Sequence, residues 1–177
     1  MRAPFIPNGR VRAPGALAAS RSFANVVVTM NLLPWILAAC ALLAPKADTT
    51  VIARAIDEAV RGEAPLFQGD EDRLKTAALV VAVAARESNL KLDAVGDHGR
   101  SVCAMQIHGG DKKLLEDHVG CIREGIRRLR ISVSTCKDYP VAVYAEGPSG
   151  CTSSRAQAIS RDRMALARRL VADVKPR

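Results

Sequence analysis

The feature that most constrains the fold is an uninterrupted apolar run, AALVVAVAA, at residues 77–85. A helix with no polar face must be buried on most sides by other elements. The run ends in Arg86-Glu87-Ser88, and a Gly-rich polar turn and the stretch Met105-Gln106-Ile107 follow it. A glutamate that ends a buried helix in this way is the first indication of a functional site.

Apolar residues at helical spacing predict the helices that surround this run. The first of these helices begins at a possible cap, Thr49 or Thr50. We expect the helices at residues 49–62, 70–88, from 111 on, 139–145 and 154–173. Between Val95 and Ile107 the helical pattern breaks and glycines appear, which predicts a small β-hairpin. The predicted fold class is mainly α, a single domain of about five helices with this hairpin after the buried helix.

The N-terminal part of the chain has the composition of a bacterial export signal. The first 39 residues contain four arginines and no acidic residue, and the stretch 23–43 is almost wholly apolar. A basic segment followed by an apolar one is the order of such signals. We therefore predict a signal and linker at residues 1–47, a domain at 48–177, and export to the periplasm or the extracellular side.

Several ways of processing this signal stay open. Leu37-Ala38-Ala39-Cys40 matches the lipobox of bacterial lipoproteins, in which Cys40 would be lipidated. The alternative is a plain signal peptide cut near Ala44 or Ala47; a permanent anchor and a true start at Met30 are further alternatives. We expect the protein to contact the membrane only through the signal or a lipid anchor.

Four cysteines besides Cys40 are typical of two disulfides in a small exported domain. No Cys-x-x-Cys pair occurs, and the three histidines lie ten residues apart, a spacing that fits no common zinc site, so we predict no metal. Four cysteines allow three pairings. Cys103 falls in the hairpin and Cys121 at the start of the next long helix, while Cys136 and Cys151 bracket the short helix. We predict Cys103–Cys121 and Cys136–Cys151.

The net charge of +8 indicates an anionic partner, and the candidates are nucleic acid, anionic membranes and anionic cell-wall polymers. Only 3% of the residues are aromatic, too few for a surface that stacks bases. The export signal and the paired cysteines also oppose a nucleic-acid partner. We therefore predict no nucleic acid.

Three motifs in order resemble those of the soluble lytic transglycosylase (SLT) group of lysozyme-like enzymes. They are Glu87-Ser88, the stretch SVCAMQI at 101–107 and the stretch AVYAEG at 142–147, and the resemblance covers roughly residues 72–150. It implies a lysozyme-like fold, a monomer without cofactor, and peptidoglycan glycan strands as the partner. Cys103-Ala104 stands where the family has Gly-Leu, and Ala145 where it has Asn, which leaves an altered activity open.

Cleavage of a glycosidic bond needs a carboxylic acid that still holds its proton near neutral pH. The apolar approach to Glu87 disfavours the charged form of its carboxyl group, so we predict Glu87 as the acid and base. In the enzymes that the sequence resembles, one glutamate suffices to break the MurNAc–GlcNAc β-1,4 bond. The N-acetyl group of the muramyl sugar assists, and the 6-hydroxyl of that sugar closes a 1,6-anhydro ring.

The resemblance also implies substrate-binding roles for Ser88, Ser101, Met105, Gln106 and Tyr144, with Tyr144 hydrogen-bonded to the catalytic carboxylate. Each has a structural alternative. Ser101 and Gln106 can serve the hydrogen bonds of the hairpin, while Met105 and Tyr144 can simply pack in the core.

Asp97 is a candidate second carboxylate, as in goose-type muramidases, which hydrolyse the same bond. Its alternative is a turn-capping role within Gly96-Asp97-His98-Gly99. A non-catalytic wall-binding protein that retains the fold is a further possibility. The last helix carries a row of arginines that we expect to be a solvated face: Arg155, Arg161, Arg163, Arg168 and Arg169.

Overall fold

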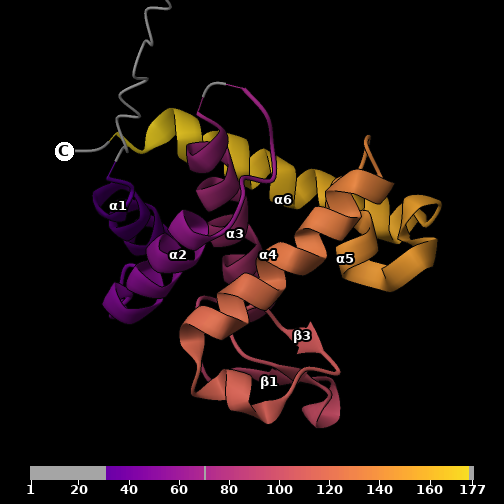
Figure 1. Ribbon diagram of the computed structural model, residues 1–177, viewed down its shortest axis with the longest axis horizontal. Helices are drawn as coiled ribbons and strands as arrows, with labels where there is room; N and C mark the ends of the chain where they lie inside the picture. Colours follow the sequence, from indigo (N-terminus) through magenta and orange to yellow (C-terminus); the bar gives the residue numbers. More distant parts are fainter. Residues whose placement is uncertain (1–30, 70, 176–177) are drawn as a thin grey trace, which may run out of the picture. The chain divides into compact units, whose positions relative to one another are not determined.

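The computed structural model describes residues 31–69 and 71–175 of the chain. These residues form α1 (Leu33–Leu43), α2 (Thr50–Gly62), α3 (Asp72–Ser88), α4 (His118–Thr135), α5 (Ala142–Glu146) and α6 (Ser154–Asp173). The short strands β1 (Val95–Gly96), β2 (Ser101–Val102) and β3 (Ile107–His108) pair antiparallel in that order. The prediction of a mainly α fold with a small antiparallel sheet is confirmed (Figure 1).

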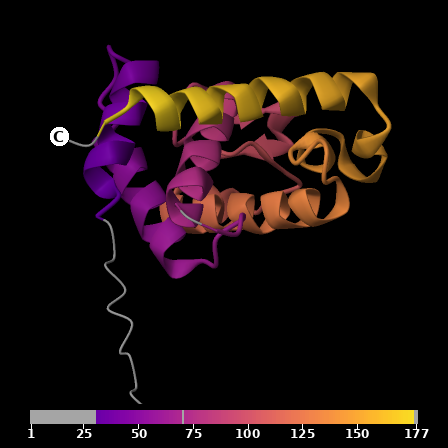
Figure 2. The ribbon, with the colours of Figure 1, turned by 90° about the horizontal axis from the view of Figure 1, so that it is seen from above.

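The core is built around α3. The side chains from Ala77 to Ala84 are fully buried, as the apolar run predicts. Helices α6, α2 and α1 pack against α3, and α4 touches it as well. Figure 2 shows α3 between α6 and α4, with the sheet below the end of α3 in Figure 1. These four helices bury α3 on most sides, as its apolar sequence predicts.

Helix α1 is part of this core, although its residues fall in the predicted signal. Trp35, Ile36, Ala39 and Cys40 are buried, and the indole Nε1 of Trp35 donates a hydrogen bond of 2.8 Å to the carbonyl of Val174. The described chain forms one compact unit from its first residue, 31, so a domain that starts at residue 48 leaves α1 out. The predicted signal at residues 1–30 lies outside the described residues.

The thiol of Cys40 is buried in α1, and desolvation raises its pKa to about 12. A lipid on Cys40 and the packing of α1 described here exclude each other, because the lipidated side chain would have to leave the core. Within the described ranges, no helix is long and apolar enough to cross a membrane.

The long helix after the sheet starts later than predicted. Residues 112–115 form a single 3₁₀ turn, and α4 begins only at His118. Two aspartates set these starts, because Asp111 accepts a hydrogen bond from the Lys113 amide and Asp117 accepts one from the Gly120 amide. Each satisfies an amide at the first turn of a helix, the usual role of an N-cap.

If α1 belongs to the folded domain, Ile36→Ala should lower the free energy of unfolding by about 2–5 kcal/mol, because Ile36 is fully buried. Leu42→Ala is the matched control in the same helix. Leu42 is 60% exposed, so the change should stay within about 0.5 kcal/mol. Urea unfolding of the two variants measures the difference. Equal, small effects would mean that α1 contributes nothing to the domain.

Candidate active site

Glu87 lies in the last turn of α3, which ends one residue later. Asn89 and Leu90 take left-handed backbone conformations, with φ of 56° and 62°. The amides of both residues close back on the last carbonyls of the helix, at Ala85 and Ala84, and the Leu90 side chain is buried. Asn tolerates this conformation better than most residues and often ends a helix. The stop after Ser88 therefore fixes Glu87 at the end of a buried helix.

The carboxylate of Glu87 forms an ion pair with Arg163 of α6. The Oε1 atom of Glu87 accepts a hydrogen bond of 2.7 Å from Nη2 of Arg163, and the two side chains are only 21% and 12% exposed. A guanidinium at this distance stabilises the ionised carboxylate. A negative charge at the C-terminal end of a helix also opposes the helix dipole, so Arg163 compensates for that position as well.

The prediction that Arg163 belongs to a solvated row is wrong for this residue alone. The other four arginines of the row are exposed. The sequence contains a signal for the difference, because the apolar stripe of α6 has Ile159, Leu166 and Leu170 on one face and Arg163 lies on that face between them. An arginine within an apolar stripe calls for a buried acidic partner.

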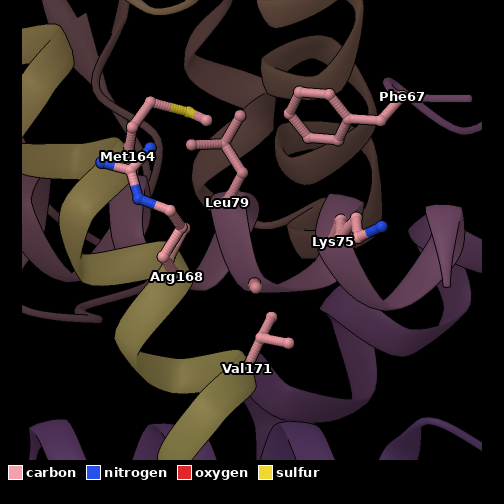
Figure 3. A pocket seen from close by; sticks show the side chains of 8 residues that line it. Phe67, Lys75, Leu79, Met164, Arg168 and Val171 are labelled. Carbon is pink, nitrogen blue, oxygen red and sulfur yellow. The ribbon is translucent and has the colours of Figure 1, made fainter.

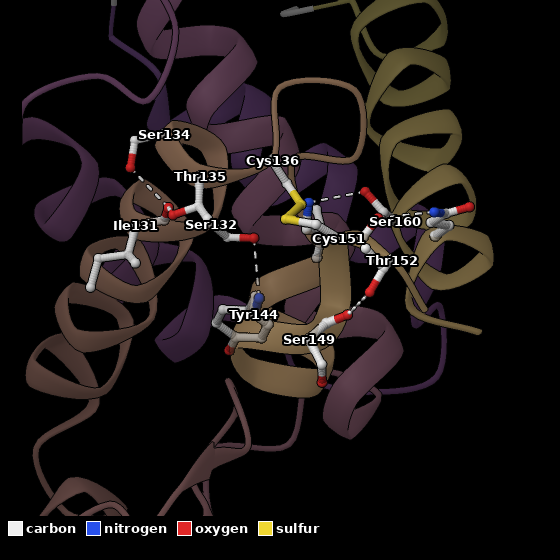
Figure 4. The surroundings of a disulfide bond; sticks show 12 residues. Ile131, Ser132, Ser134, Thr135, Cys136, Tyr144, Ser149, Cys151, Thr152 and Ser160 are labelled. Carbon is white, nitrogen blue, oxygen red and sulfur yellow. Dashed lines mark hydrogen bonds between the residues drawn. A yellow bond between two sulfur atoms is a disulfide. The ribbon is translucent and has the colours of Figure 1, made fainter. Parts of the chain in front are cut away.

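Tyr144 of α5 lies close to this ion pair. Burial raises the pKa of its hydroxyl far above the ordinary value, and the negative charge of Glu87 raises it further. The hydroxyl donates to the carbonyl of Met105 at 2.5 Å, and the Tyr144 amide donates to Oγ of the buried Ser132 (Figure 4). The expected hydrogen bond of Tyr144 to the catalytic carboxylate is thus replaced by one to Met105.

The hairpin residues serve the hairpin itself. Ser101 is buried, and its hydroxyl donates to the carboxylate of Asp97. The side-chain amide of Gln106 donates to the carbonyls of Ala94 and Cys103, both at 3.2 Å. A Cβ on Gly96 would meet Oε1 of Gln106 at 2.1 Å, so any side chain at this position would require the Gln106 amide to move. The structural alternative for Ser101 and Gln106 is therefore the one observed.

Asp97 is exposed and has its partners within the sheet. Besides Ser101, it lies 3.8 Å from Nδ1 of His108, and the Ser101 hydroxyl holds the pKa of the Asp97 carboxyl below its ordinary value. Its side chain thus bridges the turn, close to the turn-capping role considered above. Ser88 is likewise engaged, because its hydroxyl donates back to the carbonyl of Ala84.

Met105 is fully buried and packs against Gly125 of α4. A Cβ on Gly125 would lie 2.6 Å from Cε and 2.8 Å from Cγ of Met105. The absence of a side chain at Gly125 therefore makes room for Met105, whose carbonyl receives the Tyr144 hydroxyl. Met105 is thus a core residue, which is the structural alternative considered for it.

No protein-family model matches this sequence, and no curated protein or solved structure resembles it closely enough to count as a match. The site is therefore judged on the contacts of this chain. In the part of the chain that the structure describes, no three side chains of His, Cys, Asp or Glu are grouped so that they could hold a metal ion.

Two disulfides hold the elements that carry the site. Cys103 bonds Cys121, which ties the hairpin to α4, and Cys136 bonds Cys151, which ties the end of α4 to the segment after α5 (Figure 4). The Cα atoms of the pairs are 6.3 Å and 5.7 Å apart, within the usual range. Both predicted pairings are confirmed.

Several grooves lie on the described surface near these elements. One is lined by Tyr144 together with His108, Arg128, Ile131 and Gly147, so it borders the candidate site. Another lies between α3 and α6 and is lined mainly by apolar side chains (Figure 3). It contains no residue of the three motifs, so we leave it outside the candidate site.

The disulfides predict a specific pattern of thiol reactivity. Peptide mapping of the non-reduced protein should find the two linked pairs, and alkylation should label Cys40 only after the protein is unfolded, because the Cys40 thiol is buried with a pKa of about 12. A Cys103–Cys151 link, or rapid labelling of Cys40 in the native protein, would contradict this arrangement.

The packing of Met105 on Gly125 predicts an asymmetry between two glycine substitutions. Gly125→Ala should destabilise the protein by about 1–3 kcal/mol, because the new methyl group collides with Met105. Gly62→Ala is the control at the end of another helix. A Cβ there meets nothing closer than 3.5 Å, so alanine should be neutral or mildly stabilising. Thermal unfolding compares the two, and equal effects would refute the packing argument.

Proposed function

We propose that the chain is a lysozyme-like lytic transglycosylase that cleaves the MurNAc–GlcNAc bond of peptidoglycan, with Glu87 as its single acid and base. The observation that carries the proposal is that Glu87 is not a solvated residue at a helix end. It is mostly buried, paired with an inward-facing arginine, and close enough to Tyr144 to affect the Tyr144 hydroxyl.

The meeting of the three motifs supports the same proposal. The hydrogen bond from Tyr144 to Met105 joins the stretches 142–147 and 101–107, which lie 39 residues apart at these two positions. The electrostatic effect of Glu87 on Tyr144 joins both to the end of α3. Tyr144 thus connects the three motifs, through a hydrogen bond to one of them and an electrostatic interaction with the other.

The proposed reaction uses Glu87 twice. Its carboxyl group first gives a proton to the bridging oxygen while the bond from that oxygen to C1 of the muramyl sugar breaks, assisted by the N-acetyl carbonyl of that sugar. The resulting carboxylate then takes the proton of the 6-hydroxyl, whose oxygen attacks C1 and closes the 1,6-anhydro ring. Glu87 ends protonated as it began, and no water is consumed.

The partners of Asp97 favour this mechanism over that of a two-carboxylate muramidase, because Asp97 is engaged by Ser101 and His108 within the hairpin. The proposal includes export to the periplasm or the extracellular side. These compartments are oxidising, so both disulfides are stable there. The exposed arginines of α6 would face the anionic polymers of the wall. We list these four residues as the proposed contact face: Arg155, Arg161, Arg168 and Arg169.

Glu87→Gln should lower the rate of murein cleavage by about 10²–10⁴-fold or more, since glutamine cannot give up a proton. Asp97→Asn should change the rate far less. Mass spectrometry of digested murein measures both the rate and the product, and 1,6-anhydro ends are expected. Equal loss in both variants with reducing ends would indicate a two-carboxylate muramidase, and an active Glu87→Gln protein would remove the central claim.

One control is needed because Glu87→Gln leaves the charge of Arg163 without its partner. Loss of one member of a buried ion pair destabilises a protein by about 3–5 kcal/mol, and by less where the pair is partly exposed as here. The double variant Glu87→Gln/Arg163→Met removes both charges. It should recover stability without activity, which separates loss of the proton donor from loss of the fold. Wild-type protein that binds murein without cleaving it would indicate a wall-binding protein.

A further inference from the structure

The guanidinium of Arg163 has Glu87 as its main partner. Its Nη2 donates to Glu87 at 2.7 Å, while Nη1 reaches only the carbonyl of Ile159 in its own helix, at 3.5 Å. The Nε–H group is buried and has no acceptor among the described residues. A buried donor without a partner is unfavourable, so the ion pair with Glu87 accounts for the inward position of Arg163.

Two opposing influences act on the charge of Glu87. Partial burial and the C-terminal end of α3 both disfavour the ionised carboxylate. The guanidinium of Arg163 favours it. The proposed reaction needs the protonated form to break the bond and the ionised form to close the ring, so the balance between these influences decides the pH at which Glu87 can do both.

The other charged groups around Glu87 are paired elsewhere. On α3 itself, Arg86 pairs with Asp162 of α6 at 2.9 Å. On α4, Arg128 pairs with Glu124 at 2.8 Å. Tyr144 of α5 is neutral at ordinary pH, because burial raises the pKa of its hydroxyl.

The sheet and the first two helices add no further partner for Glu87. In the sheet, Asp97 and His108 lie next to each other. In α2, Asp57 pairs with Arg61, and the titratable side chain of α1 is Cys40. Among the described residues, Arg163 is thus the cation in direct contact with Glu87.

We propose that Arg163 is a positioning residue that sets the pH range of catalysis by controlling when Glu87 holds its proton. This inference rests on the proposed function. Without the guanidinium, the carboxyl group of Glu87 loses the positive charge that pairs with it at 2.7 Å. The alkaline limb of the pH–rate profile, where the general acid is lost, then moves upward.

The test compares Arg163→Met, Arg163→Lys and the control Arg54→Met. Arg54 is exposed on α2 and belongs neither to the candidate site nor to the proposed contact face. Arg163→Met should shift the alkaline limb of murein cleavage upward by about one pH unit or more. Arg163→Lys keeps the charge and should restore most of the wild-type profile, and Arg54→Met should leave it unchanged. Should Arg163→Met fail to fold, Arg163→Gln replaces it, since its neutral amide can still donate to Glu87.

A second readout does not depend on activity. The ¹³C signal of the Glu87 side-chain carboxyl, assigned by its absence in Glu87→Gln, should reach its titration midpoint at higher pH in Arg163→Met than in the wild type. A murein-inactive wild type with this NMR shift would refute the proposed function and leave the control of Glu87 by Arg163 intact. An unchanged midpoint, or activity that falls equally at every pH, would overturn the inference.

Discussion

Burial of α3 is the constraint on which the other elements depend, because the side chains from Leu79 to Ala84 leave no face for water. Helices α1, α2, α4 and α6 all contact it, and these contacts bury their own apolar faces. A helix enclosed in this way can present polar groups only at its ends. The left-handed residues Asn89 and Leu90 stop it directly after Glu87 and Ser88, so the candidate site lies at the end of the helix.

An acidic residue at that end has an electrostatic cost that the remainder of the fold offsets. The helix dipole and partial burial both act against a negative charge on Glu87, and α6 supplies Arg163 at 2.7 Å. Tyr144 completes the arrangement through the Met105 carbonyl, and Gly125 leaves the space that Met105 occupies. The environment of the Glu87 carboxylate therefore depends on the packing of α3, α5, α6 and the hairpin together.

The parts of this structure that were predictable rest on local signals. Helical periodicity identified the elements around α3, and cysteine placement identified both disulfides. What the sequence did not reveal concerns residues whose environment is set by distant partners. The packing of α1 was not predicted, because an apolar run does not identify what covers it, and the partner of Trp35 lies 139 residues away. Arg163 lies within the apolar stripe of α6, but its partner Glu87 is 76 residues away in the sequence, and their contact depends on the packing of α6 against α3.

The hydrogen bond between Trp35 and Val174 ties α1 to the residue that follows α6. The two residues lie 139 positions apart, so α1 reaches its final place in the core only once α6 is available to pack. Closing a loop of this length also slows folding.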